Sequence, residues 1–191
     1  SGVPAADDNL IFDVPGTNSF VCDALVPVTG IQQWRSGTMN WSATSPHTVA
    51  SRFDVATLTG NIGTVRITSG EMIVAGLLRV GVGSTAVGTL TLDGPNALVT
   101  CPAGGQTFIG NPNARGFLNV TGGARFVSSR GLLLDARSSQ GSVVTVDGAG
   151  STMTFLGATS DIVGANQASF ANDIVVQNGG STHQFAVLIG F

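Results

Sequence analysis

The fold is decided by residues 141–157, GSVVTVDGAGSTMTFLG, where two short alternating segments flank a turn rich in Asp and Gly. Alternation of apolar and polar residues is typical of a β-strand with one buried face. Gly-rich segments between such strands mark sharp turns. The stretch therefore predicts a strand, a corner and a second strand.

Three differently placed series of short strands recur at nearly one spacing along the chain. The first series opens and closes on Gly and comprises GTVRITSG (63–70), GTLTLDG (88–94), GFLNVTGG (116–123) and GSVVTVDG (141–148). The second comprises LRVG (78–81), TFIG (107–110), LLLD (132–135) and DIVG (161–164), and the third EMIV (71–74), ALVT (97–100), ARFV (124–127) and TMTF (152–155). Recurrence at 25 to 29 residues predicts three strands in every period.

Period-2 alternation within the first series assigns its side chains to two faces. The apolar positions expected to stack inside are Val65, Ile67, Leu90, Leu92, Leu118, Val120, Val144 and Val146. The polar positions expected to form an outer column are Arg66, Thr91, Asn119 and Thr145. The gaps between strands are too short for a crossover helix. The sequence therefore predicts an all-β fold, a right-handed parallel β-helix (solenoid) with three strands and about 25–29 residues per coil.

Glycine at the corners agrees with this fold, because sharp bends favour positive φ, which Gly adopts without a Cβ penalty. One residue too many at Ser142 and Val143 predicts a β-bulge there. Residues 1–56 carry strand-like segments between Pro and Gly turns, and we interpret them as first coils or a cap. Residues 57–191 then hold the repeats and end in an apolar strand.

The composition restricts the class of partner. Hydrophobic residues make up 42% of the 191, charged residues 10%, and the formal net charge is −3 with no Lys in the chain. Such a chain has no basic face for a phosphate backbone, so we predict no nucleic-acid partner. No run approaches the roughly 18 apolar residues of a membrane span. The first residues also lack the basic and apolar segments of a signal peptide.

The segments GTLTLDGPNALVT (88–100), RGFLNVTGGARFVSS (115–129) and GSVVTVDGAGSTMTFLG (141–157) resemble the repeat shared by bacterial autotransporter passengers and PEP-CTERM-type exoproteins. In that family a GTLTVxGxGS core alternates with an LxVG segment, and the order of segments matches over roughly residues 60–160. The resemblance implies a secreted or surface-displayed β-solenoid, usually without a known catalytic site. Met153 departs from the family, where Trp is common, and the sequence shows neither a translocator barrel nor a PEP anchor.

A glycosidase needs a pair of carboxyl groups about 5–9 Å apart. Asp93 and Asp147 occupy the same position of coils two apart, with Thr121 between them, which predicts a separation of about 10 Å. Other carboxylates elsewhere in the coil are Asp135, Asp161 and the single glutamate, Glu71. We therefore predict no catalytic residue and interpret Asp93 and Asp147 as caps of their turns.

Other candidate binding residues have plain structural interpretations. Asp7 and Asp8 are expected to be solvated, so no metal site and no cofactor are predicted. Trp34 and Trp41 either stack on sugar rings or fill the core at a solenoid end, and core packing is favoured. The histidines, His47 and His183, have no nucleophile partner in the sequence and are expected to be structural or exposed.

Arginines within the repeats either bind acidic glycans or serve as solubilising charges. They are Arg66, Arg79, Arg115, Arg125, Arg130 and Arg137. Their scatter among coil positions favours solubilising charges, and Arg115, Arg125 and Arg130 form the one group to test for glycan binding.

Cys22 falls in the first coil and Cys101 in the fourth, which places them about 14 Å apart. A disulfide needs Cα atoms within about 7 Å. We predict two buried thiols that do not form a disulfide.

The segment STHQFAVLIGF (181–191) is nearly uncharged, and a solenoid end exposes backbone groups and core side chains. We therefore expect a non-enzymatic structural or adhesive protein, extracellular or on a bacterial cell surface, that self-associates by end-to-end stacking or strand donation. The residues expected at that contact are Phe185, Val187, Ile189 and Phe191.

Two other functions remain open at this point. One is a polysaccharide-active enzyme or tailspike-like depolymerase, which would need a cleft with close carboxylates. The other is passive binding of surface glycans through Trp34, Trp41 or the arginine group.

Overall fold

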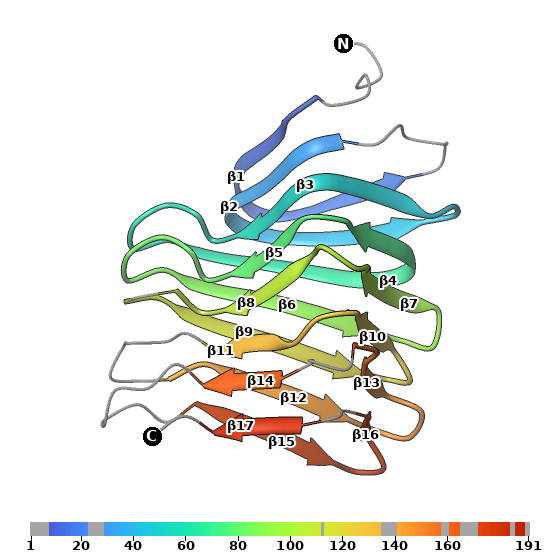
Figure 1. Ribbon diagram of the computed structural model, residues 1–191. Helices are drawn as coiled ribbons and strands as arrows, with labels where there is room; N and C mark the ends of the chain where they lie inside the picture. Colours follow the sequence, from blue (N-terminus) through green and yellow to red (C-terminus); the bar gives the residue numbers. More distant parts are fainter. Residues whose placement is uncertain are drawn as a thin grey trace.

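The computed structural model describes residues 8–22, 29–111, 113–134, 141–157, 161–164, 172–183 and 186–189. Its strands form coils that stack in succession along the chain (Figure 1). Every strand pairing among these residues is parallel, and they form no helix. The predicted all-β parallel β-solenoid is confirmed.

Each coil has three sides, which we name A, B and C in chain order. Side A stacks β1 (Leu10–Cys22), β2 (Thr29–Ala43), β4 (Ile62–Val74), β6 (Val87–Asp93), β9 (Arg115–Thr121), β12 (Val143–Asp147) and β15 (Asp173–Gln177). Side B stacks β3 (His47–Val55), the end of β4, β7 (Ala97–Cys101), β10 (Arg125–Ser128), β13 (Thr152–Phe155) and β16 (Ser181–His183). Side C stacks the starts of β1 and β2, the end of β3, β5 (Leu77–Val80), β8 (Gln106–Ile109), β11 (Leu132–Leu134), β14 (Asp161–Gly164) and β17 (Ala186–Ile189).

The four earliest strands each bend around a corner and therefore belong to two sides. In β2, for example, residues 31–34 lie on side C beside β3, and residues 37–42 lie on side A beside β4. The strands within residues 10–55 thus stack on the repeats that follow them. Six steps separate the first and last of the seven strands of side A, which gives about six turns.

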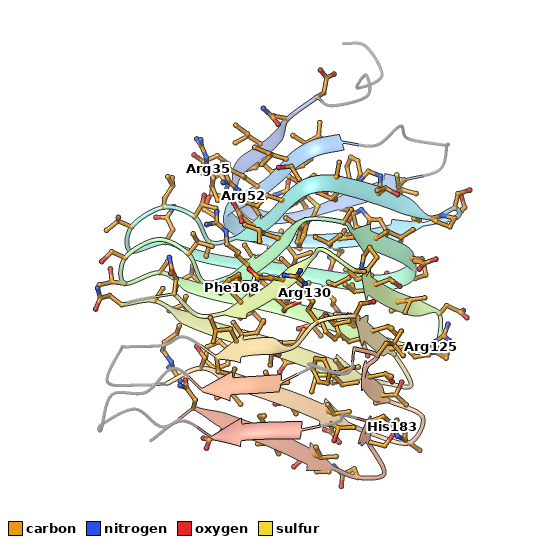
Figure 2. All side chains as sticks on the ribbon, in the orientation of Figure 1. Arg35, Arg52, Phe108, Arg125, Arg130 and His183 are labelled. Atoms are coloured by element: carbon orange, nitrogen blue, oxygen red, sulfur yellow. The ribbon has the colours of Figure 1, made fainter. Side chains whose placement is uncertain are left out.

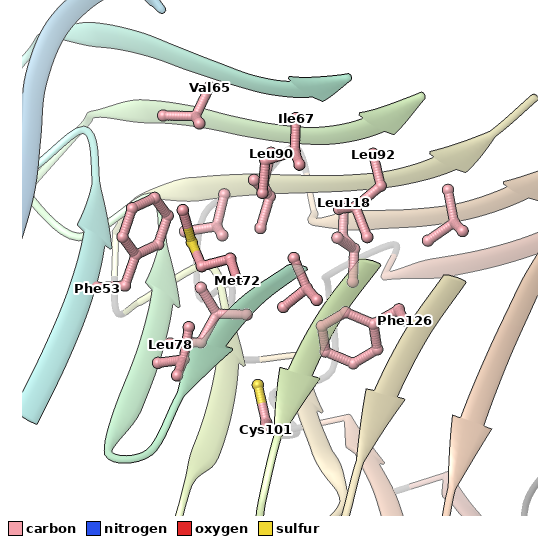
Figure 3. Packing of buried hydrophobic residues seen from close by; sticks show 14 of the residues in the cluster. Phe53, Val65, Ile67, Met72, Leu78, Leu90, Leu92, Cys101, Leu118 and Phe126 are labelled. Carbon is pink, nitrogen blue, oxygen red and sulfur yellow. The ribbon is translucent and has the colours of Figure 1, made fainter. Parts of the chain in front are cut away.

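The inward apolar rows run through the coils as predicted. Val65 lies beside Leu90, and Leu118 lies between Leu90 and Val144, with all four side chains at most 1% exposed. Figure 3 shows side chains from these rows meeting those of sides B and C in one core. The predicted outer column is also in register, and its members are Arg66, Thr91, Asn119 and Thr145.

Glycine is required at the corners for two different reasons. Gly94, Gly122 and Gly148, between sides A and B, have φ angles of 105°, 64° and 93°, which residues with a Cβ rarely adopt. Gly116, at the start of side A, is needed for close approach: a Cβ there would lie 2.5 Å from the carbonyl oxygen of Val80. The corners therefore select Gly both for backbone conformation and for space.

The predicted bulge at Ser142 and Val143 is wrong. Residues 143–147 pair with residues 117–121 without a register shift. Ser142 takes the place beside Gly116, and its Oγ accepts a hydrogen bond from the Gly116 N–H at 3.0 Å. The extra residue is thus accommodated before the strand begins, where it does not disturb the ladder.

The two ends of the described solenoid differ in how their core positions are covered. At the first coil, the ring of Phe12 stacks on Trp34 with 4.1 Å between centroids, and Phe20 packs edge-on against Phe12 at 5.7 Å. At the last coil, Ile174 and Val176 continue the inward rows but are 36% and 44% exposed. Among the described strands, β15 pairs with β12 alone, so its other backbone edge has no strand beside it.

Substitutions of two neighbouring residues in one strand are expected to lower the free energy of unfolding by different amounts, because one residue belongs to an inward row and the next faces outward. Leu118→Ala removes buried side-chain volume from β9 and is expected to lower the free energy of unfolding by about 2–5 kcal/mol. The control Asn119→Ala lies next to it on the outer face and loses only one hydrogen bond, at 3.3 Å to Thr91, which is worth about 1 kcal/mol. Urea unfolding monitored by circular dichroism measures both, and equal losses would contradict the assigned faces.

Candidate functional site

The densest group of charges lies on the outer surface of side C, in the first coils. Asp54 alternates along β3 with Phe53 and Val55, which are buried in the core, so its side chain points to the outer surface. Asp54 is nevertheless 0% exposed. A buried carboxylate is stable only when charged or polar partners surround it, and here the partners are arginines.

Arg79 of β5 lies directly beside Asp54 in the ladder and holds it with both ends of its guanidinium group. Its Nε donates to Oδ1 at 2.7 Å, and one terminal nitrogen donates to Oδ2 at 2.8 Å. Arg52 Nε is also 2.7 Å from Oδ2, although its N–H is not aligned for a hydrogen bond. Both carboxylate oxygens are therefore engaged, and two positive charges surround one negative charge.

A second polar group is buried inside the core at the corner between sides A and B. The amide nitrogen of Gln32 donates to Nε2 of His47, and Nδ1 of His47 lies 3.8 Å from the Sγ atom of Cys22. Because Nε2 accepts, the ring proton of neutral His47 is on Nδ1 and faces the sulfur. A thiol beside an imidazole is a nucleophile arrangement in principle, but all three side chains are at most 2% exposed. No substrate reaches them in this conformation, and we interpret the group as a polar part of the core.

Asp93 and Asp147 lie in one column of side A with Thr121 between them, as predicted. Asp93 forms an ion pair with Arg66 and accepts a hydrogen bond from Thr121 Oγ1 at 3.1 Å. The hydrogen bond from Arg66, opposed in part by burial, holds the pKa of the Asp93 carboxyl below its usual value. Asp93 is therefore ionised at neutral pH and is unsuited to act as a general acid.

Asp147 is bonded across the coils and not to its own turn. Gln177 and Asn178 of the next coil donate to its two oxygens at 3.2 and 2.8 Å. The backbone of that turn is held instead by Ser151, whose Oγ donates to the Asp147 carbonyl at 2.7 Å. The interpretation of these aspartates as turn caps is therefore wrong for both. Asp93 is also held by side chains of neighbouring coils, and in the turn after Asp147 Ser151 performs the capping role.

Trp34 and Trp41 are core residues, at 3% and 1% exposed. Their rings contact Phe12 and His47, respectively, inside the first coils. Neither ring presents a face to solvent, so a sugar ring cannot stack on these tryptophans in this conformation. The favoured prediction, core packing, is confirmed.

The arginine group chosen from the sequence is not assembled in space. Arg115 begins a strand of side A, where it donates to the Gly141 carbonyl and lies 4.7 Å from the ring of Phe117. Arg125 begins a strand of side B, and Arg130 follows it at the corner toward side C (Figure 2). These three side chains lie at different corners of one coil and do not form a common surface.

Several predicted residues lie outside the described part of the chain: Asp7, Asp135, Arg137, Phe185 and Phe191. Val187 and Ile189 fall within β17 on side C, beside Ile162 and Gly164 of β14.

No group of three or more His, Cys, Asp or Glu side chains in the described ranges is placed to hold a metal ion. No helix that could cross a membrane occurs in the same ranges.

One of the two groups that sequence reasoning missed carries the repeat signal. Asp54 and Arg79 are 25 residues apart, which equals one coil and places them side by side in the ladder. Cys22 and His47 are also 25 residues apart, but the ladder pairs Cys22 with Ala43, so these two meet across the corner between sides A and B. Gln32 carried no such signal, because it reaches His47 across the interior from another side.

Comparison with known proteins identifies no relative. No family model, no curated protein and no solved structure matches the chain. Of the resemblance to autotransporter passengers and PEP-CTERM-type exoproteins, the structure supports the β-solenoid fold of about six turns.

Burial of His47 predicts a pH dependence of stability. Burial lowers the pKa of His47 from its ordinary value near 6.5, so the folded chain resists a proton that the unfolded chain binds. Stability is therefore expected to fall as the pH drops from about 7 to about 5. Urea unfolding across that range measures the slope, and His47→Gln is expected to reduce it.

His183, which is exposed on β16, provides the matched control. His183→Gln removes the same chemical group and is expected to keep the wild-type slope. The role of His47 is refuted if both variants show the same pH dependence.

Burial of the cysteine thiols predicts that they resist alkylation in the folded chain. Neither cysteine forms a disulfide, as predicted, and burial raises the pKa of Cys101 to about 12. At pH 8 only about one Cys101 in ten thousand is a thiolate, which is the reactive form. Iodoacetamide is expected to label Cys101 only after denaturation, as read by peptide mass spectrometry. Rapid labelling of the native chain would show that β7 is open to solvent.

Proposed function

We propose that this chain is a non-enzymatic structural and adhesive β-solenoid that acts outside the cell or on a bacterial surface and self-associates end to end. The observation that carries the proposal is the exposure of core positions in the last described coil. Ile174 and Val176 are 36% and 44% exposed, whereas Val144 and Val146, which precede them in the same rows, are 0% exposed. The extracellular location rests on the resemblance of the repeats to those of exported proteins.

A further coil placed on β15 would repeat an interaction that the solenoid already makes at every step. It would bond the backbone edge of β15 that has no strand beside it, at about 1 kcal/mol net per hydrogen bond. It would also cover Ile174 and Val176, and covering side chains exposed to this extent contributes about 1 kcal/mol each. These gains accumulate over three sides of a coil, whereas the entropy of association is lost once.

The coil nearest the other end provides the complementary edge. Among the described strands, β1 pairs with β2 alone, and its core positions Phe12 and Phe20 are only partly buried. An edge of β15 that meets an edge of β1 is a contact between different surfaces. Such heterologous contacts do not close on themselves unless the rotation forms a ring. The expected product is therefore a filament that extends along the coil axis.

Cleavage of polysaccharides has no observation in its favour. Asp93 and Asp147, the column closest to a carboxylate pair, are each engaged by side chains of neighbouring coils.

Neighbouring residues of β15 provide the test of assembly. Val176→Lys places a charge in the inward row at the exposed end, where it must be desolvated if another coil stacks there. The expected result is loss of the oligomers that the 191-residue wild-type chain forms, measured by light scattering across a concentration series and by electron microscopy.

Val175→Lys is the matched control, because Val175 is 37% exposed on the same strand but alternates to the outer face. This variant is expected to assemble like the wild type. A wild-type chain that stays monomeric at high concentration would overturn the proposal, as would equal effects of the two lysines.

A further inference from the structure

The buried side-chain atoms without a hydrogen-bond partner are concentrated in one place. In the described ranges they are Arg35 Nε, Trp41 Nε1, Arg52 Nε and Thr57 Oγ1. Native structures leave few such atoms, and each one points to a strained site or to an acceptor supplied from outside the chain. Arg52 Nε already has Asp54 Oδ2 at 2.7 Å as a charged partner, so an outside acceptor is called for only by the atoms of Arg35, Trp41 and Thr57. All of them except the Trp41 atom belong to the region around Asp54.

The ladder brings these residues to one corner of the early coils. Trp34 lies beside Val55, and the Ala56 N–H donates to the Trp34 carbonyl at 2.7 Å. Arg35 and Thr57 are the next residues after these partners. The Nε atom of Arg52 is held in the same region by its contact with Asp54. Figure 2 shows Arg35 and Arg52 together on this side of the solenoid.

Charge is in excess at this corner. Asp54 compensates only one of the guanidinium groups of Arg52 and Arg79, and Arg35 adds a third. The nearest carboxylate along the ladder is Asp13, which accepts a hydrogen bond from Ser36 Oγ at 2.9 Å. No ion pair joins Asp13 to Arg35 in the described structure. The corner therefore holds a surplus of fixed positive charge with donors in place.

An aromatic ring follows directly along side C. Phe108 lies beside Arg79 in the ladder and is half-buried on the outer surface. Arg52 and Asp54 lie two coils from Phe108 on the same side of the solenoid. A ligand that reaches both is therefore extended and joins an oxyanion to a ring with an apolar face. A uronic acid has this chemistry, because its carboxylate pairs with arginine and its C–H face packs on an aromatic side chain.

We propose that Arg35, Arg52 and Phe108 form a binding site for the acidic sugars of a uronate-containing polysaccharide. Asp54 and Arg79 support the site from below. The two hydrogen bonds between them fix the Asp54 carboxylate, and this carboxylate orients the guanidinium group of Arg52. Thr57 contributes a hydroxyl at the same corner. The site lies on the side of the solenoid and does not depend on end-to-end assembly.

The test is calorimetric titration of the chain with a galacturonate trisaccharide, with the neutral galactose trisaccharide as the comparison ligand. The acidic sugar is expected to bind, and Arg35→Gln or Arg52→Gln is expected to weaken binding by about tenfold or more, the usual effect of removing a charge-assisted hydrogen bond. Arg125→Gln is the matched control, because it removes the same charge from an exposed position of side B. It is expected to leave the affinity unchanged.

Arg52 also contacts Asp54, so its substitution can lower stability. Arg35→Gln keeps the test decisive, because Arg35 Nε has no partner whose loss would unfold the chain. A further titration with sodium sulfate separates a site for a small oxyanion from a site for a sugar, and Phe108→Ser is expected to weaken only the binding of the trisaccharide.

Three results would overturn the proposal: no binding of the acidic trisaccharide, equal weakening by Arg125→Gln, or sulfate binding alone. Performing the titration on the Val176→Lys variant as well distinguishes this site from assembly. Binding by a monomeric variant supports the site whatever the outcome for filaments.

Discussion

The whole structure depends on the register of the parallel ladder, which places each residue beside its counterpart one coil away. A strand that slipped by one residue would turn its inward side chains to the outside. At β6 this slip would exchange Leu90, which is 0% exposed, with the polar Thr91. Because all three sides carry buried rows, a slip would expose apolar side chains on every side at once. Each coil therefore stabilises the register of its neighbours. The glycine corners make this possible, because they absorb the change of direction without adding residues to the ladder.

The same register decides where chemistry can occur on this molecule. Inside the described coils, the rows form one apolar core, and even the polar group of Gln32, His47 and Cys22 is sealed from solvent. Outside, side chains one period apart become neighbours, so charges from successive coils meet. Asp54 and Arg79 show this directly, since they are adjacent in the ladder and joined by two hydrogen bonds. Residues that form one site on the surface of a solenoid are therefore expected about one coil apart in the sequence.

The sequence predicted the repeats well, because alternation and glycine spacing are local signals. The described residues between 63 and 155 thus had their inward rows assigned correctly, apart from the bulge expected at Ser142 and Val143. The first coils were harder to place, because β1 and β2 contain register shifts, as between Phe12 and Asp13 and between Trp41 and Ser42. Each shift breaks the simple count of residues per coil in these first strands. Asp54 and Arg79 pair without a shift, so their spacing of 25 residues was a usable signal that sequence reasoning overlooked. The prediction at Ser142 was wrong for the opposite reason: an extra residue looked like a bulge, but Ser142 lies before β12, beside Gly116, and the ladder is not interrupted.

The ends and the sides of this solenoid have different physical characters, and this difference connects the two proposals. The ends carry exposed backbone edges and apolar rows, which suit another coil of the same kind. The sides carry separate charged clusters, which suit a ligand with charge. End-to-end stacking would use the first and leave the second accessible, so the side C cluster would recur once per chain along a filament. Six steps within the chain and one between chains, each of about 4.8 Å, set that repeat at roughly 34 Å. A polysaccharide repeats along its own length, so many weak contacts of this kind would act together, and avidity would supply an affinity that one cluster of three arginines lacks.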